Sequence, residues 1–312
     1  MNTRELGKGG PLLTEIGLGA WAIGGAWDFG WGESNDDESI RTIHRAIELE
    51  INWIDTAPVY GLGHSEEVVG KALKGKREKV FVATKCGHVW DEKKQVRRHL
   101  KPASIRNELE ASLQRLQTDR VDLLQFHWPD PDTPVEESWV EMVRLKDEGK
   151  VRFIGVCNFG VDLLERCEAI AHVQSLQPIY NMLERDIEEE ILPWCVAHGT
   201  GIVAYSPMQS GLLTGSFDKA KLAADDWRIT HSEKFLGEKY TRGLSVVERV
   251  RPIAAQLGKT VGQLAVAWVL SNPAITSAIV GARKVQQVEA NVLATGWSFS
   301  QKDLDSIEKA LS

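Results

Sequence analysis

Short apolar runs rich in β-branched residues alternate along the chain with longer segments whose apolar positions recur at helical spacing. The short runs predict buried strands, and the longer segments predict amphipathic helices. Eight strands are predicted, over residues 16–19, 51–55, 80–85, 121–127, 151–158, 173–180, 201–206 and 277–281. Helices are predicted over residues 37–49, 66–73, 103–116, 135–147, 163–171, 187–198, 244–270, 285–293 and 301–311.

The order of these elements predicts the fold class. Strands that alternate with helices pair in parallel through right-handed crossovers, and eight such units favour a closed (β/α)8 TIM barrel of the α/β class. We expect residues 1–312 to form one domain. Two segments lie outside the repeat: residues 3–15 predict an N-terminal β-hairpin, and residues 208–242 predict a long loop after the seventh strand, typical of a lid or binding loop.

Composition narrows the function classes. Of the 312 residues 43% are hydrophobic, and the net charge of -7 argues against a nucleic-acid partner. The chain shows neither an apolar run of the roughly 18 residues that a membrane span needs nor a leader-like start, so we expect a cytoplasmic protein without a membrane partner. The 4 cysteines are scattered and the histidines lack a metal-binding spacing, so we expect reduced thiols and no metal.

Four candidate catalytic residues follow neighbouring predicted strands. Asp55, Lys85 and His127 end three of these strands, and Tyr60 lies in the loop beyond Asp55. Because the carboxyl ends of barrel strands meet at one mouth, these residues (the tetrad) should converge. A carboxylate would keep a buried lysine charged, and that charge should lower the tyrosine pKa from about 10 and make the phenol a usable acid. The histidine could orient a carbonyl oxygen.

The tetrad, with the sequence of residues 54–61 and 65–66, resembles the aldo-keto reductases, and most closely a bacterial NADPH-dependent group of that family. The resemblance extends over essentially the whole chain. It implies a (β/α)8 barrel that reduces aldehydes or ketones to alcohols with a nicotinamide coenzyme, acting on small-molecule carbonyl substrates. It also implies that the tyrosine is the general acid, that the lysine and aspartate tune it, and that the histidine positions the carbonyl.

Candidate coenzyme-binding residues lie on other strand ends. Asn158 and Gln177 offer donors and acceptors that complement a nicotinamide carboxamide, and Arg283 offers a cation for a phosphate. A cation favours NADPH, with NADH as the weaker alternative. The family often has serine where Cys157 stands, and it stacks an aromatic ring on the nicotinamide where Tyr205 stands. The full expected set is Gly19, Ala20, Trp21, Asp55, Cys157, Asn158, Gln177, Tyr205, Ser206, Pro207, Met208, Ser210, Gly211, Leu212, Gly281, Ala282, Arg283, Gln287 and Asn291.

A helix beginning near Lys284 should present free amides to a phosphate, with Gln287 and Asn291 on one face. Glu289 could approach an adenine or remain a solvated charge.

Tryptophans are frequent near the predicted strand ends. Aromatic walls at a barrel mouth would favour an apolar or aromatic carbonyl substrate, although each ring could equally pack within its own loop. The candidates for the substrate pocket are Trp21, Trp27, Trp31, Trp90, Trp128 and Trp227. His88 and Gln209 are further candidates for contact with the substrate.

Two other functions fit the same residues. Lys85 could form a Schiff base as in barrel aldolases, although a neighbouring Asp55 would hold it charged and unreactive. The chain could also be a nucleotide-binding regulatory subunit with little turnover, because the potassium-channel β subunits look like this family. The physiological substrate, the direction of reaction and the oligomeric state stay open.

Overall fold

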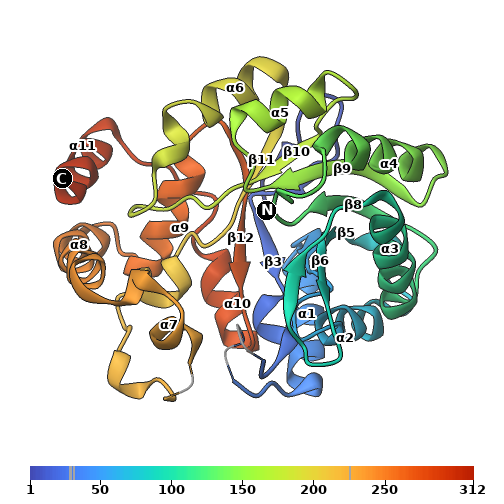
Figure 1. Cartoon of the computed structure of the whole chain (residues 1–312). Coiled ribbons are helices and arrows are strands. Elements are labelled where there is room, and N and C mark those ends of the chain that lie inside the picture. Colours follow the sequence, from blue (N-terminus) through green and yellow to red (C-terminus); the bar gives the residue numbers. More distant parts are fainter. Residues whose placement is uncertain (28–29, 31, 225) are drawn as a thin grey trace.

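The computed structural model describes residues 1–27, 30, 32–224 and 226–312. Eight parallel strands form a closed barrel, and helices surround it (Figure 1). This is a (β/α)8 TIM barrel, as the alternation of strands and helices predicted. Trp31, one of the candidate pocket residues, lies outside the described residues.

Every predicted strand is present in the barrel. In chain order the strands are β3 (Ile16–Gly19), β4 (Trp53–Asp55), β5 (Phe81–Cys86), β8 (Val121–Phe126), β9 (Val151–Cys157), β10 (Ser175–Gln177), β11 (Gly201–Ala204) and β12 (Ile275–Gly281). The barrel closes where β12 pairs with β3, with Val280 opposite Leu18 and Gly281 opposite Gly19.

The predicted helices are also present, with shifts of one to three residues at several ends and two larger differences. The helices are α1 (Asp36–Glu48), α2 (His64–Leu73), α3 (Pro102–Leu116), α4 (Val135–Asp147), α5 (Val161–Glu168), α6 (Ile191–His198), α8 (Gly237–Gln256), α9 (Val261–Ser271), α10 (Val285–Val292) and α11 (Gln301–Leu311). The single helix expected over residues 244–270 is two helices, because Gly258 takes a left-handed φ of 66° and Thr260 caps the start of α9. The segment expected to begin at residue 187 starts with a 3₁₀ turn, η3 (Asp186–Glu188), before α6.

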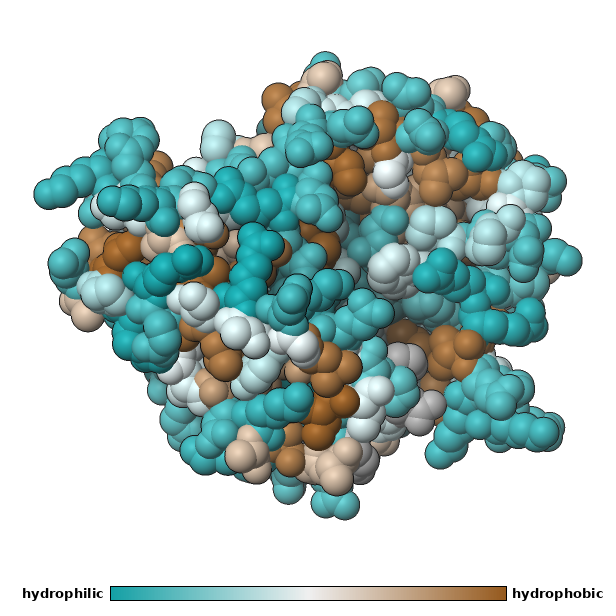
Figure 2. Space-filling model, turned by 60° about the vertical axis from the view of Figure 1, so that its left-hand side comes forward, coloured by the Kyte–Doolittle hydropathy of each residue, from teal (hydrophilic) through white to brown (hydrophobic). Residues whose placement is uncertain are grey.

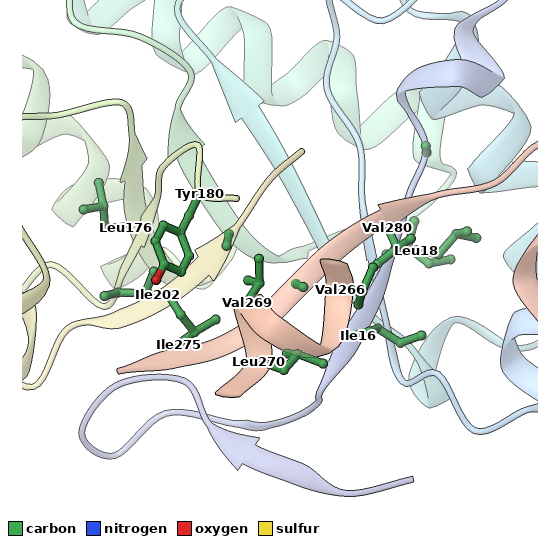
Figure 3. Close-up of a cluster of buried hydrophobic side chains, with 14 of the residues drawn as sticks. Ile16, Leu18, Leu176, Tyr180, Ile202, Val266, Val269, Leu270, Ile275 and Val280 are labelled. Atoms are coloured by element: carbon green, nitrogen blue, oxygen red, sulfur yellow. The ribbon is translucent and has the colours of Figure 1, made fainter. Parts of the chain in front are cut away.

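Two apolar layers hold the barrel together. The outer layer lies between the strands and the helices, and Figure 3 shows part of it, where side chains of β3 and β12 face those of α9. The inner layer fills the barrel itself and consists of Leu6, Leu13, Trp53, Phe81, Ala83, Leu123, Val203 and Ile279. Burial on both faces explains why the strands read as nearly continuous apolar runs.

The predicted N-terminal hairpin covers the amino end of the barrel. It consists of β1 (Thr3–Glu5) and β2 (Leu12–Thr14), paired in antiparallel fashion. The Gln174 side chain, just before β10, donates to the Leu6 carbonyl oxygen at 2.7 Å. Leu6 and Leu13 are fully buried, so the hairpin closes the inner layer from below.

A second hairpin follows β5, and the sequence pattern did not predict it. It consists of β6 (His88–Trp90) and β7 (Val96–Arg98), and its residues are partly or fully exposed. Because β5 runs toward the carboxyl end of the barrel, this hairpin lies at that end. An exposed polar hairpin leaves no apolar alternation in the sequence, so strand patterning could not reveal it.

The long segment after β11 contains short helices rather than an extended loop. They are η4 (Gln209–Thr214), η5 (Lys219–Lys221), α7 (Trp227–Thr230) and η6 (Glu233–Phe235), and α8 then begins at Gly237. Asp226 and Asp218 cap two of them by accepting hydrogen bonds from backbone amides.

The surface seen in Figure 2 is mostly hydrophilic, with separate apolar patches. Among the described helices, no single one is long and apolar enough to cross a membrane. Only α8 and α9 taken together reach that length and composition, and they are bent by 89° relative to each other.

Candidate active site

The four tetrad residues meet at the carboxyl end of the barrel. Asp55 is the last residue of β4, Lys85 lies near the end of β5, and His127 follows β8. The loop that carries Tyr60 is held by a close backbone approach, since a Cβ on Gly61 would lie only 2.0 Å from the Gly24 carbonyl oxygen. Gly61 also has a φ of 65°, so glycine suits this position on both grounds.

Lys85 is the centre of the cluster. Its Nζ donates to Asp55 Oδ2 at 2.7 Å, to the Thr56 carbonyl oxygen at 3.0 Å and to the Tyr60 hydroxyl at 3.1 Å. Only 1% of Lys85 and 3% of Asp55 is exposed. A buried ammonium is tolerated here because its three donors each have an acceptor, one of them a carboxylate.

The expected lowering of the Tyr60 pKa is wrong for this structure. Burial raises the pKa of Tyr60 to about 12, and the opposing effect of Lys85 is smaller. Burial lowers the pKa of Lys85, but Asp55 and Tyr60 more than offset this effect, so its pKa lies above the ordinary value. At neutral pH the cluster therefore holds a charged ammonium beside a protonated phenol.

His127 lies against both Tyr60 and a second histidine. The rings of Tyr60 and His127 meet edge to face, with centroids 5.7 Å apart. His127 also contacts His88, the first residue of β6, and the Nδ1 atoms of the two rings lie 3.2 Å apart. Burial lowers the His127 pKa well below the usual range and lowers the His88 pKa to about 4, so both rings are neutral at neutral pH.

Two amide side chains tie the ends of β9 and β10 to the tetrad. Gln177 Nε2 donates to Asp55 Oδ1 at 2.8 Å, so Asp55 bridges Lys85 and Gln177. Asn158 Nδ2 donates to the His127 carbonyl oxygen at 3.1 Å, and its Oδ1 accepts from the Tyr205 hydroxyl at 3.0 Å. Asn158 has a left-handed φ of 60°, which non-glycine residues adopt rarely and often at functional sites.

Several expected coenzyme residues lie around this mouth. Ala20, just after β3, donates its amide to the Asp55 carbonyl oxygen at 2.8 Å. Cys157 ends β9 and is buried, and burial raises its thiol pKa. The segment after β11 turns back on itself through left-handed residues, namely Ser206, Gln209, Ser210 and Gly211. The other expected residues of this segment are Pro207, Met208 and Leu212.

The expected phosphate site after β12 is only partly as predicted. Gln287 Oε1 accepts from the amides of Arg283 and Lys284, at 2.8 and 3.2 Å. These two amides are therefore bonded and not free, because the glutamine three residues along reaches back to them. Asn291 Nδ2 donates at 3.4 Å to the carbonyl oxygen of Gly281, next to Ala282.

Charged residues from three segments gather near Arg283. Burial and the nearby Arg228 lower the Arg283 pKa, while Asp226 and Glu38 act in the opposite direction. Arg228 also pairs with Asp226 at 2.6 Å and donates to the Ser210 carbonyl oxygen at 3.3 Å. The Glu289 carboxylate is paired with a neighbouring helix, because Arg45 Nε of α1 donates to it at 2.9 Å.

The candidate pocket residues divide into two groups. Trp21 and Trp227 pack together at 5.1 Å between centroids, and Trp21 lies 6.4 Å from the Tyr60 ring. The second group lies at the β6–β7 hairpin, where Trp90 ends β6 and Arg98 of β7 lies 5.0 Å over the Trp128 ring. Trp27 lies in the loop after η1 (Trp21–Gly24).

Gln209 was a candidate for substrate contact, but the structure gives it a structural role. It is 3% exposed, and its amide accepts from Asn181 at 3.2 Å and donates to Glu184 at 2.9 Å.

Three features of the site were not predicted from the sequence. They are the His88–His127 contact, the Thr56 carbonyl that accepts from Lys85, and the Asp226–Arg228 pair near Arg283. The first depends on the unpredicted hairpin, and the second depends on tertiary packing. The third joins residues only two apart, but its position near Arg283 depends on tertiary packing. Motif spacing carries no signal for any of them.

Comparison with known proteins agrees with this geometry. A model of the Aldo/keto reductase family matches residues 15–312. The chain is 43% identical over 314 residues to aldo-keto reductase YhdN of Bacillus subtilis (strain 168), covering 98% of this chain and 93% of that protein. It is 37% identical over 318 residues to the NADH-specific methylglyoxal reductase of Escherichia coli (strain K12), covering 97% and 96%. The structure of glycerol dehydrogenase AKR11B4 from Gluconobacter oxydans matches with a TM-score of 0.89 at 40% identity, covering 99% of this chain and 95% of that one. The chain therefore belongs to the aldo/keto reductase family, whose members are oxidoreductases that act on carbonyl compounds.

Proposed function

We propose that this protein reduces aldehydes and ketones to alcohols with NADPH, and that Asp55, Tyr60, Lys85 and His127 are its catalytic residues. One observation carries the proposal: the buried Lys85 ammonium touches the Asp55 carboxylate at 2.7 Å and the Tyr60 hydroxyl at 3.1 Å. This arrangement places a protonated phenol next to a fixed positive charge at the mouth of the barrel.

The tetrad supplies the proton for the reaction. When bound, NADPH supplies the hydride for the carbonyl carbon. The Tyr60 hydroxyl donates its proton to the carbonyl oxygen, and Lys85 stabilises the phenolate that this transfer leaves. Asp55 keeps Lys85 charged. A Tyr60 pKa of about 12 keeps the phenol protonated at neutral pH, which is the state that reduction requires.

The donor set fits a nicotinamide coenzyme. Asn158 and Gln177 bring amides to the strand ends beside the tetrad, and Tyr205 brings a ring that bonds to Asn158. We propose that these three residues hold the nicotinamide. The residues proposed to hold the rest of the coenzyme are Gly19, Ala20, Trp21, Asp55, Cys157, Ser206, Pro207, Met208, Ser210, Gly211, Leu212, Gly281, Ala282, Arg283, Gln287 and Asn291.

The preference for NADPH over NADH depends on Arg283. Arg228 and Arg283 are close enough for one to lower the pKa of the other, and a phosphate would relieve this repulsion. We expect Arg283→Leu to raise the KM for NADPH about 10-fold or more, the value of one charge-assisted hydrogen bond, and to leave the KM for NADH nearly unchanged. Steady-state kinetics with both coenzymes measures this. Equal use of both coenzymes by the unmodified protein would contradict the preference, and the NADH-specific relative makes this comparison necessary.

Tyr60→Phe tests the proton donor. Loss of a positioned acid should lower kcat for an aromatic aldehyde about 100-fold or more, followed through NADPH absorbance. The matched control is Tyr240→Phe, which changes a tyrosine of α8 that packs against Phe217. Equal turnover by Tyr60→Phe and the unmodified protein would remove Tyr60 from this role.

Two further measurements separate the other candidate functions. Trapping of a carbonyl compound on Lys85 by borohydride would favour an aldolase, but the Asp55 ion pair keeps Lys85 protonated and opposes a Schiff base. Tight NADPH retention with very slow turnover would favour a regulatory subunit.

The aromatic pair Trp21 and Trp227 beside Tyr60 favours an apolar or aromatic carbonyl substrate. His88, Trp27, Trp90 and Trp128 are proposed as further pocket residues. We also propose that residues 1–312 form one domain in the cytoplasm, since its four cysteines are free and buried, as reducing conditions would allow.

A further inference from the structure

His88 and His127 form a contact that the proton-transfer scheme does not use. Their Nδ1 atoms lie 3.2 Å apart, and their ring centroids lie 4.6 Å apart. His88 belongs to β6 of the second hairpin (β6–β7, here named the mouth hairpin), whereas His127 follows β8 of the barrel. The contact therefore joins the hairpin to the tetrad.

The protonation states of the two rings constrain each other. Burial and the nearby Lys85 lower the pKa of both histidines, so both are neutral at neutral pH. A neutral imidazole has one nitrogen with a proton and one without. A hydrogen bond between two Nδ1 atoms needs one proton between them, so one ring carries its proton on Nδ1 and the other carries its proton on Nε2.

Only one of these two arrangements suits a carbonyl substrate. Because Nδ1 of His127 faces His88, Nε2 is the ring nitrogen of His127 that is left for a ligand. If His127 were the donor in the pair, its Nε2 would be a bare acceptor and would repel a carbonyl oxygen. If His88 is the donor, His127 keeps its proton on Nε2 and can donate to that oxygen.

We propose that His88 is a positioning residue, which donates from Nδ1 to Nδ1 of His127 and thereby holds His127 in the tautomer that presents an Nε2 proton to the substrate. The consequence for catalysis rests on the proposed carbonyl reduction. The tautomer itself does not.

Hydrogen bonds and a tight backbone turn at Gly87 fix the start of the mouth hairpin, and this holds His88 in place. The amide of Gly87 donates to Glu108 Oε2 at 2.8 Å, and Ser104 Oγ donates to Glu108 Oε1 at 3.0 Å. The His99 amide donates to the Gly87 carbonyl oxygen at 3.0 Å, which closes the hairpin. Gly87 has a φ of 92°, and a Cβ there would lie 2.4 Å from Leu100, so this tight entry requires glycine.

The direct test is nitrogen NMR of the protein labelled with ¹⁵N in histidine. Protonated and bare ring nitrogens have distinct ¹⁵N shifts, and His127→Asn and His88→Asn assign the two rings. We expect the unmodified protein to show a protonated Nε2 on His127 and a protonated Nδ1 on His88. A proton on Nδ1 of His127 would overturn the proposal, and this measurement does not need an active enzyme.

Two variants then test the consequence. His88→Phe keeps a ring but removes the donor, so His127 should become a mixture of tautomers and kcat should fall about 10- to 100-fold. His88→Asn places an amide donor close to the position of Nδ1 and should restore the Nε2 tautomer and most of kcat. The affinity for NADPH, measured by quenching of tryptophan fluorescence, should be the same in all three proteins.

The outcomes separate the two proposals. If His88→Phe leaves both the His127 tautomer and kcat unchanged, His88 only packs in the mouth and the positioning role is refuted. If the tautomer changes as expected but no carbonyl compound is reduced by any of the proteins, the positioning of His127 stands and the proposed function fails.

Discussion

The two antiparallel hairpins among the described residues lie at opposite ends of the barrel and are built from opposite kinds of residue. The N-terminal hairpin buries Leu6 and Leu13 completely and completes the apolar filling of the barrel. The mouth hairpin, β6–β7, carries His88 and Trp90, which stay partly exposed, and two exposed arginines. One hairpin adds apolar burial, and the other brings polar and aromatic groups to the tetrad.

This difference matches the different roles of the two ends of a (β/α)8 barrel. Residues at the amino end of the strands serve stability, and residues at the carboxyl end serve chemistry. The same local structure can serve either end because its side chains, rather than its backbone, decide what it contributes. Changes in the two hairpins should therefore separate stability from activity.

Leu13→Ala should have the largest effect on stability. Leu13 is fully buried, so truncation leaves a cavity and should lower the free energy of unfolding by about 2–5 kcal/mol. Leu12→Ala is the matched control, because Leu12 lies on the same strand and is 62% exposed. Urea unfolding measures the loss, and kcat of the folded variant should stay close to that of the unmodified protein. A large fall in kcat of the folded Leu13→Ala variant would contradict the assignment of this hairpin to stability alone.

Glu108→Gln should have an intermediate effect that depends on pH. Burial raises the pKa of Glu108 to about 7 in the folded protein, above the ordinary value of 4.5. The folded state holds this proton more tightly than the unfolded state, so stability should fall as the pH rises from about 4.5 to about 7, by at most about 3 kcal/mol. Glutamine cannot ionise but can still accept from the Gly87 amide, so the variant should lose this slope.

Urea unfolding at about pH 5 and pH 8 gives the slope for Glu108→Gln and for an exposed control, Glu165→Gln. The control should keep the slope of the unmodified protein. If Glu108→Gln keeps it too, burial of this carboxyl at the foot of the mouth hairpin does not affect stability.

Arg98→Ala should have the smallest effect on stability. Arg98 lies 5.0 Å over the Trp128 ring, a contact worth about 0.5–1 kcal/mol at an exposed site. We expect the KM for an aromatic aldehyde to rise a few-fold, because Trp128 loses the cation that covers it. Arg97→Ala, the neighbouring residue of β7, should change neither quantity. A stability loss larger than that of Leu13→Ala would reverse the roles assigned to the two hairpins.

Most of the fold could be predicted because buried strands and amphipathic helices leave strong periodic signals. The strand predicted at residues 16–19 has those bounds in the structure, as do the helices predicted at 135–147 and 301–311. The start of α2 was predicted wrongly, at Glu66, which left Ser65 outside the helix. Helix α2 begins at His64, and the buried Ser65 hydroxyl donates to the Ala20 carbonyl oxygen instead. Ser65 therefore bonds to a backbone group that is distant in sequence, and it does not cap the start of α2.

The positions of the tetrad could be predicted from strand ends and family resemblance, but their energetics could not. The Tyr60 pKa depends on how completely the phenol is buried, and sequence neighbours do not determine that burial. The contact of His88 with His127 depends on a hairpin of mostly charged and polar residues, whose sequence resembles an ordinary exposed loop. Both the burial of Tyr60 and the contact between His88 and His127 depend on residues that are far apart in the sequence.

Asn158 limits what natural variation can place at the end of β9. Glycine would accept its backbone angle but would leave the His127 carbonyl and the Tyr205 hydroxyl without the bridge that now joins them. Aspartate would offer an acceptor to the hydroxyl and a second, repelling acceptor to the carbonyl. Branched side chains would meet steric resistance from the backbone itself. A saturation library selected for activity should therefore return asparagine almost alone at this position.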